Sequence, residues 1–371
     1  MNFDVMASPR AGDAAPVARI FAVVPACNEA DAISFTITSL REQTSPPDLT
    51  VVVPNNCTDA TAAVAERAGA YVLPYPGHNP DRKAGAINYG LAQLEHLLRP
   101  GDAVLVMDAD TTLSPEFLAI ARHHMRGRVG GCGGTFVGRD CRRMLGYLQR
   151  MEFYRYGQTA RRNGYRAFVL TGTGTLFSWD ALRHVRAARR TGIGLPAGAS
   201  FYDTHSLTED NELTFALQTL GYHTICPERM VTTTDVMESV GKLIAQRERW
   251  YLGALRNIWH YGWRMPGHLR WVYWRQQIGL CISATIAATY LAMVIGTVAI
   301  TGTVAFSWWW TLPCALLSAE RTMTVWGMGW RARLYAVAFL PEQLYTLLLT
   351  WSYLRALTTF LRGGKGGWQA T

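Results

Sequence analysis

Charged residues are scarce in this sequence of 371 residues. They make up 17% of the chain, against about 25% in soluble domains, while hydrophobic residues make up 49% and aromatic residues 11%. A disordered chain would be rich in charge and poor in aromatic residues, so this composition excludes one. The length fits roughly two domains.

Several sequence signals are also missing. The sequence contains neither the GxGxxG motif of dinucleotide-binding folds nor the GxxxxGK[ST] motif of P-loop proteins. The seven cysteines are odd in number and include no CxxC pair, so we expect reduced thiols in place of a disulfide or zinc framework. Residues 1–19 lack the continuous apolar core of a signal peptide, from which we expect the first 250 residues to stay in the cytoplasm.

The longest stretch without charge lies near the C-terminus. Residues 276–319 include no Asp, Glu, Lys, Arg or His, and these 44 residues suffice for two membrane spans with a turn at 301–303. A second apolar tract, 334–361, would be a third span or a helix at the membrane surface. Twelve of the 13 Trp residues lie at or beyond Trp250, as expected near a membrane–water boundary. The Trp- and Arg-rich segment 256–275 predicts an interfacial amphipathic helix.

The net charge of +9 is spread along the chain. No long run of Lys or Arg indicates contact with nucleic acid, so we expect no nucleic acid among the partners. We attribute the basic excess to orientation at a lipid bilayer and to an anionic substrate.

The first 250 residues alternate short apolar runs with helical periodicity. This alternation predicts an α/β fold in which a mostly parallel sheet lies between helices. We expect strands at 20–24, 49–53, 71–73, 103–107 and 168–170, and helices at 31–43, about 59–68, 84–98, 211–220 and 240–259.

Polar side chains follow three of these strands. Asn28 and Glu29 come after the first strand, residues 55–59 after the second, and Asp108-Ala109-Asp110 after the fourth. Because ligands bind beyond the carboxyl ends of parallel strands, these groups predict one binding site. Two carboxylates at i and i+2 of extended chain point to the same side, and such oxygen ligands suit Mg²⁺ or Mn²⁺.

Four further groups are candidates for this site, and each also has an ordinary structural explanation. Thr208-Glu209-Asp210 offers a general base, or only the acidic start of a helix. In residues 246–250, Gln-Arg-Glu-Arg-Trp, the Arg side chains could bind phosphate and the Trp ring could stack on a sugar. Alternatively, the segment is only a basic interfacial helix. Residues 171–175, Thr-Gly-Thr-Gly-Thr, let a ligand approach the backbone, or form a turn. Lys83 is a cation at a helix start, where it opposes the helix dipole, so an anion could compensate it. Alternatively, Lys83 is simply solvated.

The order of these groups resembles the family-2 glycosyltransferases with the GT-A fold, in particular the membrane-bound branch of cellulose, chitin and hyaluronan synthases. The resemblance covers about residues 18–260, and residues 246–250 fit the Q-x-x-R-W pattern of that branch in full. It rests on motifs at 24–29, 55–59, 83, 108–110, 171–177, 208–210 and 246–250. The family often has acidic residues where this chain has Asn55 and Asn56, which leaves the nucleotide identity open.

The resemblance implies a role for each matching residue. Asp210 would be the catalytic base with Glu209 beside it, and Arg249 would neutralise the leaving diphosphate. Asp108 and Asp110 would hold the divalent metal. The acceptor would lie along Thr173, Gly174, Thr175 and Trp250. The nucleotide-sugar would contact Pro25, Asn28, Glu29, Asn56, Asp59, Lys83, Asp108, Gln246, Arg247 and Arg249.

These interpretations divide the chain into a flexible tail (1–17), a GT-A domain (18–250), an interfacial region (251–275) and a membrane region with two or three helices (276–371). They imply a multi-pass enzyme of the plasma (inner) membrane, with its catalytic domain in the cytoplasm and a homo-oligomer as one arrangement. It would be a metal-dependent hexosyl- or N-acetylhexosaminyltransferase that inverts a UDP-linked donor to build a β-linked glycan. Two alternatives stay open: non-processive transfer to a polyprenyl-phosphate, glycolipid or protein, and a non-catalytic scaffold that senses nucleotide-sugar.

Overall fold

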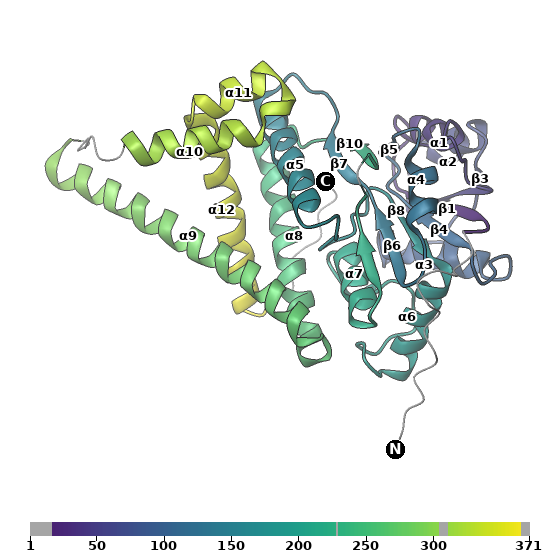
Figure 1. Ribbon diagram of the computed structural model, residues 1–371. Coiled ribbons are helices and arrows are strands. Elements are labelled where there is room, and N and C mark those ends of the chain that lie inside the picture. The colour runs from purple at the N-terminus through teal and green to yellow at the C-terminus, as the bar shows by residue number, and fades with distance from the viewer. Residues whose placement is uncertain (1–16, 228, 304–310, 365–371) are drawn as a thin grey trace. The chain divides into compact units, whose positions relative to one another are not determined.

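The computed structural model describes residues 17–227, 229–303 and 311–364 (Figure 1). The chain divides into two compact units: Met1–Val137 with Thr159–Asp235, and Gly138–Gln158 with Val236–Thr371. The predicted tail, 1–17, lies outside the described residues except for Val17, which is buried in the core of the first unit.

The first unit holds nearly all of the strands. They are β1 (Ile20–Ala26), β2 (Leu49–Pro54), β3 (Tyr71–Val72), β4 (Ala103–Val106), β5 (Thr112–Leu113), β6 (Val129–Gly133), β7 (Thr135–Gly138), β8 (Thr175–Ser178), β9 (His223–Ile225) and β10 (Val231–Thr234). Its helices are α1 (Ile33–Arg41), α2 (Thr61–Arg67), α3 (Arg82–Leu94), α4 (Phe117–His124), α6 (Trp179–Thr191) and α7 (Glu209–Thr219).

Seven strands form the main sheet in the order β3-β2-β1-β4-β8-β6-β9, and β5, β10 and β7 form a small second sheet. All neighbours in the main sheet pair in parallel except β8, which runs antiparallel to both β4 and β6. The predicted mostly parallel sheet is therefore confirmed, together with its strands near residues 20, 49, 71 and 103.

Helices cover both faces of this sheet. On one face, Ile20, Ala22 and Val24 of β1 pack into a core with Ile37 of α1 and Phe117 of α4. On the other face α3 lies against β1 and β2, where Gly90 approaches Val23 and Val53 so closely that a Cβ would lie 3.0–3.1 Å from their methyl groups. Burial on both faces explains why these strands are apolar throughout.

The strand predicted at 168–170 is wrong. These residues form an irregular segment that is anchored by hydrogen bonds to neighbouring elements. The backbone N–H of Leu170 donates to Thr214 Oγ1 at 2.9 Å, and the N–H of Ala167 donates to the carbonyl of Thr224 at 3.0 Å. The apolar run reflects the burial of Leu170, which is 1% exposed.

The second unit is helical. It contains most of α5 (Met144–Arg162), then α8 (Val240–Tyr261), a short 3₁₀ turn η1 (Gly262–Arg264), α9 (Gly267–Thr301), α10 (Thr311–Thr324), a second 3₁₀ turn η3 (Trp326–Met328), α11 (Trp330–Val337) and α12 (Leu340–Leu361). Helix α8 carries residues 246–250, so this motif belongs to the second unit, whereas the sequence predicted a catalytic domain that runs to residue 250. The predicted helix 256–275 is broken, because α8 ends before Gly262, which has φ 47°, and α9 begins after Pro266.

Among the described residues, α9 is the one helix long and apolar enough to cross a membrane. It ends at Thr301 with Gly302 in the left-handed region, φ 68°, which agrees with the turn predicted there. The predicted second span falls partly on residues outside the described ranges, and its described part, α10, has 14 residues and includes Glu320 and Arg321. The tract 334–361 is split between α11 and α12.

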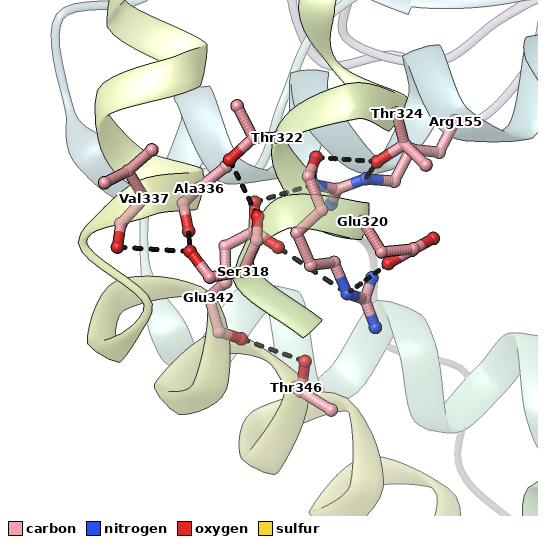
Figure 2. A network of polar contacts seen from close by, with 10 residues as sticks. Arg155, Ser318, Glu320, Thr322, Thr324, Ala336, Val337, Glu342 and Thr346 are labelled. Carbon is pink, nitrogen blue, oxygen red and sulfur yellow. Dashed lines mark hydrogen bonds and ion pairs between the residues drawn. The ribbon is translucent and has the colours of Figure 1, made fainter. Parts of the chain in front are cut away.

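A network of polar contacts connects α5, α10, α11 and α12 (Figure 2). Arg155 donates to Glu342 Oε1 at 2.6 Å and to Thr324 Oγ1 at 2.9 Å, and Glu342 is 5% exposed. Ser318 Oγ donates to the carbonyl of Ala336 at 3.3 Å. The charge of Glu342, which the sequence places inside an apolar tract, is thus paired within the protein.

Candidate active site

The loops that follow β1 and β2 are tied together by side chains. Asn28, in the left-handed region with φ 57°, accepts from the backbone N–H of Thr58 at 2.7 Å. Asp59 accepts from the backbone N–H groups of Ala30 at 3.1 Å and Thr61 at 3.0 Å. Hydrogen bonds from the Thr61 side chain and from these N–H groups lower the pKa of Asp59. Both predicted residues therefore lie at the expected edge of the sheet and shape its loops, while Pro25 is buried inside β1.

Asn56 anchors the loop that leads into α3. Its amide donates to the carbonyl of Asn79 at 2.8 Å, and its side-chain oxygen accepts from the N–H of Asn79 at 2.9 Å. Asn55 is buried and accepts from the Asn79 side chain at 3.2 Å. An acidic residue in place of Asn56 could not donate to the Asn79 carbonyl, which explains an amide at this position. Asn56 thus positions the start of α3 rather than presenting a free amide.

Lys83, at the start of α3, reaches two carboxylates from distant parts of the chain. Its Nζ lies 2.6 Å from Asp108 Oδ1 and 3.1 Å from Glu209 Oε1. Burial opposes the positive charge, but Asp108, Glu209 and Asp210 outweigh it and raise the pKa of Lys83. The side chain keeps 28% exposure, so a ligand can reach this cation. Lys83 therefore connects Asp108 of the predicted metal motif with Glu209, the neighbour of the predicted catalytic base.

Asp210 lies in the first turn of α7, and two backbone N–H groups donate to its carboxylate. Its Oδ2 accepts from the N–H of Gly172 at 3.0 Å, and its Oδ1 accepts from the N–H of Asn211 at 2.7 Å. Burial and the neighbouring Glu209 raise its pKa to about 6, against the opposing effect of Lys83. The helix begins two residues earlier than predicted, so Glu209 and Asp210 lie within its first turn.

The loop before β8 lies directly against this cluster. A Cβ built on Gly172 would lie 2.5 Å from Lys83 Nζ, 3.6 Å from Asp210 Oδ2 and 3.7 Å from Asp108 Oδ2. Glycine is therefore required for the approach of this backbone to the charged groups. β8 is antiparallel to β4, so the residues that precede it reach the edge where β4 ends.

The other small residues of this loop serve packing. Thr175 is 1% exposed, and its hydroxyl donates to the carbonyl of Thr171 at 2.9 Å. A Cβ on Gly174 would lie 3.0 Å from a Thr232 methyl group, and Thr173 Oγ1 lies 3.0 Å from Thr232 Oγ1. The prediction that Gly174 and Thr175 line the acceptor path is corrected, because both face the protein interior.

Four carboxylates influence one another across this edge of the sheet. Burial, then Asp108 and Asp235, raise the pKa of Asp110 to about 6. Burial, then Asp110, Asp108 and Asp235, raise the pKa of Glu29 to about 7. In the described residues no three His, Cys, Asp or Glu side chains are already arranged as metal ligands. Asp235 follows β10 and was missed, since the polar run Val-Thr-Thr-Thr before it gives no signal of a buried strand.

In the second unit, the structure gives Arg247 a role that the sequence did not predict. The side chain is 1% exposed, and its Nη2 donates to Glu152 Oε2 of α5 at 2.8 Å. Its guanidinium also lies 4.2 Å from the Trp250 ring centre and 5.6 Å from that of Phe153. A buried, paired guanidinium is not available to a nucleotide, so the prediction of Arg247 as a donor contact is wrong. Gln246 accepts from Arg247 at 3.0 Å, while Arg249 is half-buried on α8.

The parallel-dominated sheet, with Lys83, paired carboxylates and a helix N-terminus at one edge, defines the GT-A class of glycosyltransferase folds. The chain belongs to the glycosyl transferase family group 2, whose model matches residues 103–320. The predicted resemblance to family-2 glycosyltransferases is thereby confirmed.

Individual relatives are more distant. Poly-beta-1,6-N-acetyl-D-glucosamine synthase of Staphylococcus epidermidis is 25% identical over 243 residues, which cover 62% of this chain and 54% of that protein. The chain thus spans about half the length of the curated relatives it matches. A mannosyltransferase from Pyrobaculum calidifontis, solved with GDP-Man and Mn²⁺, is similar with a TM-score of 0.59 over 94% of this chain and 90% of that one, at 18% identity. This likeness shows the fold.

Proposed function

We propose that the protein is a metal-dependent glycosyltransferase that moves a sugar from a nucleotide-sugar to an acceptor hydroxyl with inversion. The observation that carries the proposal is the cluster at the carboxyl edge of the sheet. There Lys83 lies between Asp108 and Glu209, and Asp210 is fixed by two backbone N–H groups. A cation for phosphate and an oriented carboxylate for a hydroxyl proton are the groups that such a transfer needs.

The carboxylates at the edge fit a divalent cation. Asp110 and Glu29 have raised pKa values in part because Asp108 and Asp235 repel their negative charge. A cation would relieve this repulsion, and carboxylate oxygens are suitable ligands for Mg²⁺ or Mn²⁺. Asp108 and Asp110 would hold the ion, with Asp235 a further candidate. When bound, the ion supplies positive charge for the diphosphate.

The residues of the first unit account for the remaining steps. Lys83 binds the donor phosphates and stabilises the charge that develops on the leaving group. Asp210 takes the proton of the attacking hydroxyl, and its pKa of about 6 places it near the range in which a general base works best. A single displacement by that hydroxyl inverts the anomeric carbon. Gly172 leaves room for the reacting groups beside both side chains.

The second unit supports the membrane part of the proposal. We propose that α9 anchors the enzyme in the plasma (inner) membrane as one span of a multi-pass arrangement, with the catalytic unit in the cytoplasm. By their match to the family motif, we assign Gln246, Arg249 and Trp250 to binding of the donor diphosphate and the acceptor. The relative from S. epidermidis supports an N-acetylhexosamine donor and a β-linked glycan product. Non-processive transfer to a polyprenyl-phosphate, glycolipid or protein acceptor is the alternative.

The test uses the full-length protein purified in detergent. It is incubated with UDP-N-acetylglucosamine, UDP-glucose or GDP-mannose and Mn²⁺, and the release of nucleoside diphosphate is measured. We expect release with one donor, and Asp210→Asn should abolish it while donor binding persists. Asp140→Asn, a change of the same chemistry at a side chain 85% exposed, should leave release unchanged. Release with no donor would contradict the proposal, and wild-type turnover in Asp210→Asn would remove Asp210 as the base.

A further inference from the structure

A groove of about 400 Å³ lies between α3 and α6 and is also lined by the loop 199–204. Its volume falls within the range of sites for small ligands. Neither Lys83 nor Asp108 nor Asp210 lines it. The groove is thus a second concave surface on the first unit, and the transfer reaction as derived above does not use it.

The groove offers aromatic rings beside planar polar groups. Tyr75 and Tyr89 meet edge to face, with ring centres 5.2 Å apart. Arg186 lies 4.2 Å above the Phe201 ring. Aromatic rings present apolar faces on which the C–H side of a sugar ring can stack. Planar carboxylate and guanidinium groups can each bond two neighbouring hydroxyls.

The balance of charge argues for a neutral ligand. Glu95 already forms a bidentate ion pair with Arg186, in which Arg186 Nη1 donates to Glu95 Oε2 at 2.8 Å. Glu95 also interacts with the nearby Arg190, and Asp81 adds a negative charge to the wall of the groove. A phosphate site would concentrate positive charge, whereas here both signs are present. Mixed charge with aromatic rings suits a polyhydroxylated ligand.

The groove is connected to the active site through one pair of hydrogen bonds. Asn88 lines the groove, and its side chain makes two hydrogen bonds of 2.9 Å with the backbone of Tyr202, one as donor and one as acceptor. Tyr202 is 2% exposed; burial raises the pKa of its hydroxyl, and the charges of Lys83 and Asp210 also act on that pKa. A ligand that contacts Asn88 can therefore influence the position of the loop that contains Tyr202, near the catalytic cluster.

We propose that this groove is a second saccharide site, which binds an oligosaccharide stretch of the acceptor or product apart from the point of transfer. The identity of the ligand as acceptor or product rests on the proposed function, whereas saccharide binding itself does not. Arg190 and Tyr89 carry the recognition: Arg190 bonds hydroxyls, and the Tyr89 ring stacks on a sugar.

The experiment measures binding to the full-length protein in detergent by saturation-transfer NMR and calorimetry. The probes are β-1,6-linked N-acetylglucosamine oligosaccharides, cello-oligosaccharides and manno-oligosaccharides, with inorganic phosphate and UDP as anionic competitors. We expect one saccharide to bind equally well to the wild type and to Asp210→Asn. Tyr89→Ala and Arg190→Ala should each weaken binding by about fivefold or more, and Tyr89→Phe, which keeps the ring, by less than about twofold.

Three outcomes would overturn the saccharide site, and one outcome would overturn only the proposed function. Wild-type affinity in both Tyr89→Ala and Arg190→Ala would place saccharide binding elsewhere. Binding of none of the saccharides, or displacement of a bound saccharide by phosphate, would show that the groove is no saccharide site. If the wild type binds a saccharide in the groove but releases no nucleoside diphosphate from any donor, the proposed function fails and the groove stands. If a donor releases nucleoside diphosphate and both variants bind saccharide normally, only the proposal of a saccharide site in the groove fails.

Discussion

We expect the substitution Arg247→Met to lower the stability of the second unit and to leave the affinity for the donor nearly unchanged, because the Arg247 guanidinium is buried in an ion pair. The guanidinium is 1% exposed and lies 2.8 Å from Glu152, whose side chain is 32% exposed. Tyr345 also donates to Glu152. Breaking a fully buried ion pair by removing one partner destabilises a protein by about 3–5 kcal/mol. Because Glu152 keeps partial contact with water, we expect Arg247→Met to lower the stability by about 2–4 kcal/mol.

The assay is thermal unfolding in detergent, followed by Trp fluorescence, beside the donor KM of the folded enzyme. For a unit of this size the loss corresponds to a fall in the apparent melting temperature of about 5–15 °C. A double-mutant cycle with Glu152→Gln should give a coupling of about 1–3 kcal/mol. The matched control is Arg355→Met, which breaks an ion pair of equal length, 2.8 Å, with Glu248 on the same helix, but at 52% exposure. It should cost less than about 1 kcal/mol.

Two results would refute this reasoning. The first is an Arg247→Met variant with wild-type thermal stability and a donor KM raised tenfold or more, which would restore Arg247 as a nucleotide contact. The second is equal loss of stability in Arg355→Met, which would show that the burial of Arg247 does not determine the effect.

Further expectations concern the catalytic edge. Because Asp110 has a pKa of about 6 and must lose its proton to bind a cation, the affinity for Mn²⁺, measured by calorimetry, should fall about tenfold from pH 7.5 to pH 5, and Asp110→Asn should flatten this dependence. Lys83 lowers the pKa of Asp210, so Lys83→Met should move the acidic limb of the pH–rate profile from about pH 6 to higher pH; a limb that stays in place would contradict the assignment of the base. Asn56→Ala leaves the N–H and carbonyl of Asn79 without their partners and should raise the donor KM several-fold while kcat changes little, and an unchanged KM would exclude a positioning role.

The sequence predicted which loops meet at one edge of the sheet, because short-range patterns determine where the strands end. Apolar runs end at Ala26, Pro54 and Val106, and polar residues follow each of them. In a parallel sheet the ends of such runs meet at one edge, so Asp59 and Asp108 could be assigned to one site without knowing any distance. The strand order itself was not needed.

Other features depend on contacts that are distant in the sequence and could not be predicted. Asp235 reaches the site from a small sheet of polar strands, where Thr232 pairs with Leu113. The partner of Arg247 lies 95 positions away on another helix, so a motif match alone could not reveal that the guanidinium is buried. The break between α8 and α9 depends on the positive φ of Gly262, a property that a helical pattern of Trp and Arg does not disclose.

The reversed direction of β8 has a consequence for folding. Val106 of β4 pairs with Thr175 of β8, so the strand can be inserted only after a long intervening stretch of chain has closed into a loop, which is slow compared with the formation of local hairpins and helices. Because Gly172 precedes this strand and its N–H donates to Asp210, the proposed base is fully positioned only when β8 has joined the sheet. The transferase site would therefore be among the last features to form, and a chain that has recovered its helices would still be inactive until β8 is in place.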